Sequence, residues 1–177
     1  MRTIARTGLG VAILFAATSP ICAQQTGEPS TFSDVTRTAW YNIRDLIVAS
    51  ATKMPEEHFG FHPTKDVRTF GEILGHLAGE HFAICGGLTG RVPPKVAFEK
   101  LKTKAEIRKT LDESIAICDL AYGLMTDQNA AFRYRVFNAD YSRLALLMSN
   151  ITHDSEHYGN LVTYMRLNKI VPPSSAR

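Results

Sequence analysis

Two helix starts constrain the fold of this 177-residue chain more than any other feature of its sequence. Thr69 stands three residues before Glu72, and Thr103 stands three residues before Glu106. A threonine and a glutamate at this spacing can each bond the other's backbone amide, which is the capping box that begins a helix. The sequence therefore predicts one helix from Thr69 onward and another from Thr103 onward.

Apolar residues recur every three or four positions after both starts, as a helix packed on one face requires. The earlier helix is expected to end at Gly86 and Gly87, which are typical of a helix C-terminus. The two stripes comprise Ile73, Leu74, Leu77, His81 and Ile84 in the earlier helix, and Ile107, Leu111, Ser114, Cys118, Ala121 and Met125 in the later one.

Two more helices flank this pair. The first is predicted over residues 34–53, capped by Ser33 and stopped by Pro55. The last is predicted from Ser142 to Leu167, with Asp140 as a candidate cap. The apolar stripe of the first helix comprises Val35, Ala39, Ile43, Leu46, Ile47 and Ser50.

Four amphipathic helices predict an all-α fold, a four-helix bundle. The connection between helices two and three, residues 88–102, is long for antiparallel neighbours, so we expect a crossover that leaves these two helices parallel. The polar and aromatic segment 126–140 has room for a short strand, but the sequence offers it no hairpin partner.

The first residues have the order of a secretory signal peptide. Arg2 and Arg6 precede an apolar run over residues 8–17, which is too short to span a bilayer. Cleavage after Ala23 would divide the chain into a signal peptide (1–23), a linker (24–31) and one domain (32–173), placing the protein in the periplasm or outside the cell. An uncleaved N-terminal anchor is the alternative; after cleavage we expect no stable membrane anchor.

The charge of the chain argues against nucleic acid as a partner, and its cysteines could form a disulfide. The net charge of the whole chain is +3, and cleavage would remove two of its arginines, so the sequence has no electrostatic footprint for nucleic acid. Cys85 and Cys118 would remain, and an oxidising compartment would permit a disulfide between them. Two buried thiols are the alternative that spacing alone leaves open.

His153 and His157 are the strongest candidates for chemistry. Four residues apart on a helix, they lie about 40° apart around the axis, so both imidazoles can converge on one divalent ion. With Glu156 they also match the H-x-x-E-H pattern of one class of zinc peptidase. No Asp, Glu, His or Cys follows His157 to supply the remaining ligand, so Glu156 is better interpreted as a solvent-facing charge.

A third ligand must therefore come from upstream. His76 adjoins the apolar stripe of helix two, which would face helix four, whereas His81 lies about 140° around the helix from it and should not serve the same ion. Glu80, one turn from His76, could be a fourth ligand, could fix the tautomer of an imidazole, or could be a surface carboxylate. The candidates are His58, His62, Glu72, His76, Glu80 and His81.

The segment MPEEHFGFHPTKDVRTFGEILGHLA and the terminal THDSEHYGNLVTYMRLNKIVPPS together resemble the DinB-like proteins over residues 36–173. The resemblance implies a bundle with up-down-down-up helix directions and a metal site of three histidines, here His76, His153 and His157. It also implies that Cys85 and Cys118 lie toward similar ends of parallel helices, which favours a disulfide.

These observations predict an exported protein that binds a divalent metal ion, zinc or nickel, through three histidines, with an activity left open. Some DinB-like relatives are thiol-dependent transferases or isomerases, so a metal-dependent thiol transferase or hydrolase is the second hypothesis. A non-catalytic, dimerising interaction module is the third. The expected partner is an unidentified small molecule, and a homodimer is a further option.

Overall fold

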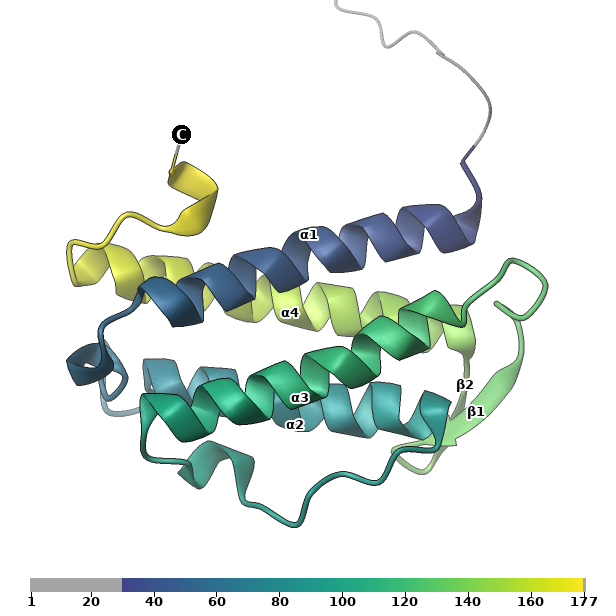
Figure 1. Cartoon of the computed structure of the whole chain (residues 1–177), viewed down its shortest axis with the longest axis horizontal. Helices are drawn as coiled ribbons and strands as arrows, with labels where there is room; N and C mark the ends of the chain where they lie inside the picture. The colour runs from purple at the N-terminus through teal and green to yellow at the C-terminus, as the bar shows by residue number, and fades with distance from the viewer. Residues whose placement is uncertain (1–29, 177) are drawn as a thin grey trace, which may run out of the picture.

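The computed structural model describes residues 30–176, and its four long helices are α1 (Phe32–Lys53), α2 (Phe70–Thr89), α3 (Lys104–Gly123) and α4 (Arg143–Leu167). Helices α1 and α4 run in one direction and α2 and α3 in the other (Figure 1). The all-α bundle and its up-down-down-up order are confirmed. The predicted signal peptide (1–23) and most of the predicted linker (24–31) lie outside the described residues, and the domain boundaries stay predictions.

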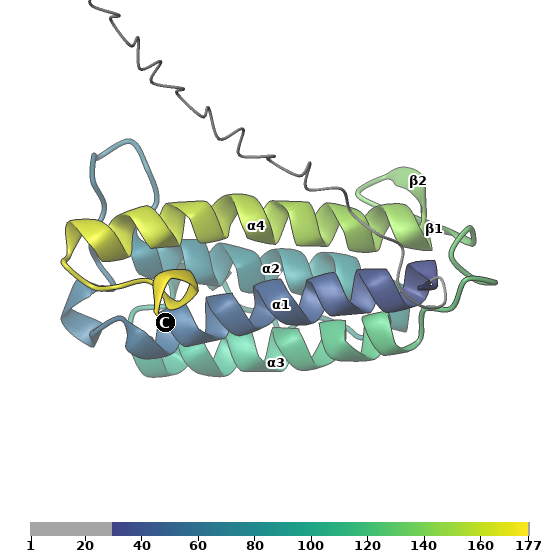
Figure 2. The ribbon, with the colours of Figure 1, turned by 90° about the horizontal axis from the view of Figure 1, so that it is seen from above.

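Around the bundle, the helices follow each other in the order α1, α4, α2, α3 (Figures 1 and 2). Helices α2 and α4 are therefore neighbours, as the histidine hypothesis requires. The crossover between α2 and α3 contains a single turn of 3-10 helix, η2 (Phe98–Lys100), which packs on α2. In the described part of the chain, no helix is both long and apolar enough to cross a membrane.

The capping chemistry of the sequence is confirmed for the two middle helices. Thr69 and Glu72 form a complete capping box, and so do Thr103 and Glu106. The predicted caps of the outer helices were each wrong by two residues: Thr31 rather than Ser33 caps α1, and Ser142 rather than Asp140 caps α4. Neighbouring hydroxyl and carboxyl side chains are nearly equivalent caps, so sequence alone does not separate them.

Helix α2 does not end at Gly86 and Gly87. It continues to Thr89, and Gly90 then takes a left-handed conformation with φ of 72°. Gly86 lies inside the helix, and the chain after the helix folds back against it: a Cβ there would lie 2.8 Å from the carbonyl oxygen of Arg91. Gly86 was thus predicted to end the helix, whereas its lack of a side chain allows the Arg91 backbone to pack closely against it.

The expectation that segment 126–140 has no hairpin partner was also wrong. Strands β1 (Arg133–Val136) and β2 (Ala139–Ser142) form an antiparallel hairpin beside the start of α4. Its two turn residues, Phe137 and Asn138, both have positive φ, 52° and 62°, as in the turns that match the twist of paired strands. Phenylalanine is a poor signal for such a turn, so the hairpin was not visible in the sequence.

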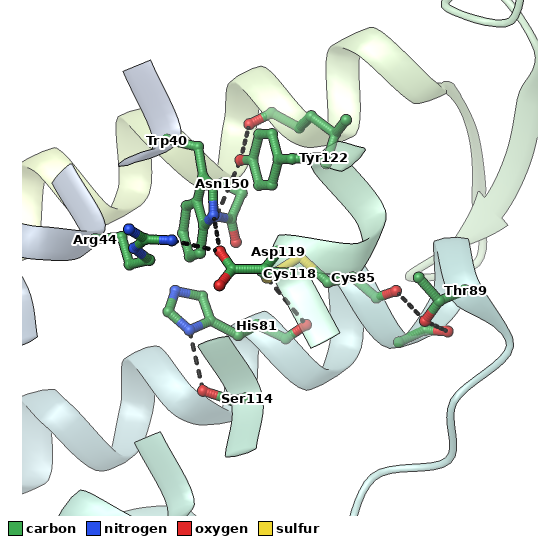
Figure 3. The surroundings of a disulfide bond; sticks show 12 residues. Trp40, Arg44, His81, Cys85, Thr89, Ser114, Cys118, Asp119, Tyr122 and Asn150 are labelled. Atoms are coloured by element: carbon green, nitrogen blue, oxygen red, sulfur yellow. Dashed lines mark hydrogen bonds and ion pairs between the residues drawn. A yellow bond between two sulfur atoms is a disulfide. The ribbon is translucent and has the colours of Figure 1, made fainter. Parts of the chain in front are cut away.

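The core lies between all four helices. The buried face of α1 is displaced by one position from the predicted stripe at its start: Trp40 is fully buried, whereas Val35 is exposed. The Trp40 ring stacks on Tyr122 of α3, with centroids 4.8 Å apart, and meets the edge of His81 of α2 (Figure 3). Large aromatic area buried between three helices stabilises their common packing.

A disulfide joins Cys85 of α2 to Cys118 of α3 (Figure 3). Both cysteines are fully buried and lie toward the C-terminal ends of the two parallel helices. The sulfur pairing that the sequence left open is therefore present in the structure. It ties together the two helices that the long crossover connects.

Candidate metal centre

Three histidines from α2 and α4 converge at one place in the structure. Nε2 of His153 lies 3.2 Å from Nε2 of His76 and 3.1 Å from Nε2 of His157. One ligand atom from each residue lies within 4.8 Å of the others. His76 comes from α2, and the other two come from successive turns of α4, as their spacing of four residues predicts.

The spacing of these nitrogens fits a metal ion. Zinc to imidazole bonds of about 2.0–2.1 Å in tetrahedral geometry place two ligand nitrogens about 3.3 Å apart. Without a cation, the single proton that Nε2 of His153 can carry could bond only one of its two neighbours. A cation between the rings would satisfy all three lone pairs together, so the donor set could hold a metal ion.

The three rings sit at the edge of the core. His157 is buried, while His76 and His153 are half-buried. Burial, together with charge repulsion from the neighbouring His153 and His76, lowers the pKa of His157 to about 4. The pKa of His76 is also lowered, chiefly by burial and then by the positive charge of Arg68. Both imidazoles are therefore neutral near pH 7, which is the form that binds metals.

The carboxylate of Glu99 pairs with His76. Nδ1 of His76 lies 3.0 Å from Oε1 of Glu99, and the guanidinium of Arg68 forms an ion pair with the same carboxylate oxygen at 3.1 Å. On α4, the side-chain amide of Asn160 lies 3.4 Å from Nδ1 of His157. Nδ1 of His153 is buried and has no hydrogen-bond partner within residues 30–176.

Two cavities flank the histidines. One has a volume of about 410 Å³ and is lined by His76, Gly79, Glu80 and the crossover segment 96–100. The other has a volume of about 490 Å³ and is lined by His157, Arg68, Asn160 and Tyr164, among others. Glu99 borders both of them. Small molecules could thus approach the three nitrogens from either side.

The remaining candidates from the sequence lie elsewhere. Glu72 belongs to the capping box of α2, His62 is exposed, and Glu156 faces solvent. His81 points into the core, where Nε2 lies 3.0 Å from Oδ1 of Asp154 and Nδ1 lies 3.1 Å from the hydroxyl of Ser114. The expectation that His81 and His76 cannot share an ion agrees with this geometry. His58 lies in the loop between α1 and α2, outside the cluster.

Glu99 is the residue that sequence reasoning missed. The only carboxylate that the sequence offered for fixing an imidazole was Glu80, as one of three options for that residue, but among the described residues Glu99 pairs with His76. Its position depends on the path of the crossover, which has no periodicity to analyse. Gly71, Gly75 and Gly79, four residues apart on one face of α2, were a signal that another segment approaches the helix closely there.

Solved structures of similar fold include DinB-like proteins from two bacilli. The chain is 14% identical to one from Bacillus cereus ATCC 10987, with a TM-score of 0.65, covering 79% of this chain and 95% of that one. For one from Bacillus subtilis the identity is 16%, the TM-score 0.62, and the coverage 81% and 99%.

A third similar structure is that of the mycothiol-dependent maleylpyruvate isomerase, with 15% identity and a TM-score of 0.59, covering 75% of this chain. The chain spans 63% of the length of that isomerase. At these identities the likeness shows the fold alone. A comparison with curated protein sequences finds no match. The family model of the DinB superfamily matches residues 39–161, well over half of the chain, and the chain therefore belongs to the DinB superfamily.

Proposed function

We propose that this protein is an exported member of the DinB superfamily that binds one divalent metal ion through His76, His153 and His157. The observation that carries the proposal is the position of Nε2 of His153, 3.2 Å and 3.1 Å from the Nε2 atoms of the other two histidines. Zinc and nickel are the preferred ions, since neutral imidazole suits both.

The neighbourhood of the three nitrogens supports an open coordination position. Three protein ligands are typical of catalytic rather than structural zinc, which usually has four. The two cavities beside His76 and His157 leave space for water or a small molecule at the remaining position. A divalent ion held there would acidify a bound water or thiol and so supply a nucleophile near neutral pH.

Export is supported by the Cys85–Cys118 disulfide, because such bonds persist in oxidising compartments. The intact mass of the protein purified from the periplasm or medium tests this part of the proposal. We expect a chain that begins after Ala23. A full-length chain retained with the cell membrane would contradict cleavage at that position.

Metal binding is tested by calorimetric titration of the chelator-treated protein with Zn²⁺ and with Ni²⁺. We expect one ion per chain for the wild type and no saturable binding for His153→Ala. His62→Ala is the matched control, because it removes an exposed histidine outside the cluster and should bind as the wild type does. Equal binding by all three proteins would refute the site.

A metal-dependent thiol transferase or hydrolase is the second candidate function. It is favoured by the cavities at the site and by the fold shared with an isomerase whose name includes mycothiol. A panel of thiol acceptors and esters tests it. Turnover that disappears in His76→Ala, while the circular dichroism spectrum is unchanged, would support catalysis. Turnover that survives in this variant would exclude the histidine site as its source.

A non-catalytic interaction module, which dimerises without metal, remains the third candidate. It predicts that the chelator-treated protein and the metal-loaded protein have the same oligomeric state and that neither binds Zn²⁺ specifically. Sedimentation velocity of both forms tests the first expectation, and specific binding of one Zn²⁺ per chain in the titration described above would contradict this hypothesis.

A further inference from the structure

The crossover between α2 and α3 places one carboxylate, that of Glu99, beside the histidine cluster. Oε1 of Glu99 lies 3.0 Å from Nδ1 of His76. A proton on Nδ1 leaves the lone pair of the ring on Nε2, the nitrogen that faces His153. The nearby carboxylate therefore favours the tautomer of His76 that can bind a metal ion through Nε2.

Glycines in α2 allow the crossover to pack closely enough to place Glu99 there. A Cβ on Gly75 would lie 2.3 Å from the carbonyl oxygen of Phe98, and a Cβ on Gly79 would lie 3.0 Å from its ring. The Phe98 ring also stacks on Phe82, with centroids 5.4 Å apart. The backbone of the crossover thus lies directly on α2 one residue before Glu99, and Gly75 immediately precedes His76 in the chain.

Glu99 also compensates an unfavourable charge. Arg68, in the loop before α2, lies close enough to bind the same carboxylate oxygen at 3.1 Å. A guanidinium at this position would oppose the arrival of a divalent cation between the histidines. Because the side chains of Arg68 and Glu99 are both exposed, water screens this compensation.

We propose that Glu99 is a positioning residue of the metal site and that it sets the affinity of His76 for the ion. Packing of the crossover against Gly75 and Gly79 holds Glu99 in place. The inference rests on the proposed three-histidine site. From the sequence, Glu80 was considered for this role as one of three options, and Glu99 was not considered. Carboxylates that orient metal-binding histidines typically change affinity by about 10- to 100-fold when removed.

The test is competition for Zn²⁺ between the full chain and a chromophoric chelator. Glu99→Ala should bind Zn²⁺ about 10- to 100-fold more weakly than the wild type. Glu99→Gln keeps an acceptor oxygen and should lie between them. Glu80→Ala is the matched control, since Glu80 lines the same cavity without pairing with His76, and should lose less than about threefold. Equal affinity for wild type and Glu99→Ala, or an equal loss in Glu80→Ala, would overturn the proposal.

A second variant tests whether packing of the crossover against Gly75 holds Glu99 in place. Gly75→Ala forces the Phe98 backbone away and should weaken Zn²⁺ binding as Glu99→Ala does, whereas adding Gly75→Ala to Glu99→Ala should cause no further loss. The visible spectrum of the Co²⁺-loaded protein should change in Glu99→Ala and not in Glu80→Ala. If Gly75→Ala fails to fold, the Glu99 series and the Co²⁺ spectra still decide.

Failure of this inference is distinguishable from failure of the proposed function. Zn²⁺ binding that is lost in His153→Ala but unaffected in Glu99→Ala would overturn the role of Glu99 alone. Wild-type protein that binds no Zn²⁺ would overturn both.

Discussion

His81 and Asp154 form an ion-pair geometry in the centre of the bundle, with Nε2 of the imidazole 3.0 Å from the carboxylate and side chains only 1% and 0% exposed. Asn150 donates to the same carboxylate over 3.1 Å, and Ser114 completes the bonding of the imidazole. The cluster joins α2, α3 and α4 directly behind the candidate metal centre, because Asp154 follows His153 in the chain.

Removing one partner of this pair should cost much more stability than removing a surface charge. Asp154→Ala leaves His81 buried without its acceptor, and we expect the free energy of unfolding to fall by about 3–5 kcal/mol. Urea unfolding with a chelator present measures this without a contribution from metal. Asp45→Ala, which removes an exposed carboxylate paired with Arg44, should cost less than about 1 kcal/mol. Similar losses in both variants would contradict the structural role of the pair.

Reduction of the disulfide should destabilise the fold without abolishing it. Cys85 and Cys118 are separated by 33 positions, and releasing a loop of this length costs about 3–4 kcal/mol in the chain-entropy model. The double variant Cys85→Ala with Cys118→Ala should therefore unfold at a lower urea concentration than the oxidised wild type. The reduced wild type should resemble the variant. Equal unfolding midpoints with and without reductant would show that the bond contributes nothing.

Acid should destabilise the metal-free protein through its histidines. The pKa of His157 is about 4 in the folded protein and near 6.5 in an unfolded chain, so the unfolded chain binds more protons between these values. The histidine contribution to stability is thus present above about pH 6.5 and is lost as the pH falls toward 4. Urea midpoints across this range should decline less steeply for His157→Gln than for wild type. Parallel declines would assign the acid sensitivity to other groups.

The helices could be predicted from the sequence because their signals are local. The two capping boxes, at Thr69 and Thr103, begin helices as predicted, and the spacing of His153 and His157 places both rings on one face of α4. His76 was located by its place beside the apolar stripe of α2 and by the family resemblance. The structure brings all three histidines together.

The missed features depend on contacts between segments that are distant in the sequence. Glu99 reaches His76 only because the crossover packs on Gly75, and nothing in the sequence near residue 99 indicates that contact. Asp154 stands among polar residues of α4, yet it is fully buried because His81 lies opposite. The hairpin was missed because its turn, Phe137–Asn138, lacks the usual glycine.

The most direct test of the metal site is elemental analysis of protein purified without chelator. The account predicts about one equivalent of a divalent metal per chain in the wild type and in His62→Ala, and almost none in His153→Ala, with all three equally folded. Equal metal content in the wild type and in His153→Ala would contradict the assignment of His76, His153 and His157 as ligands.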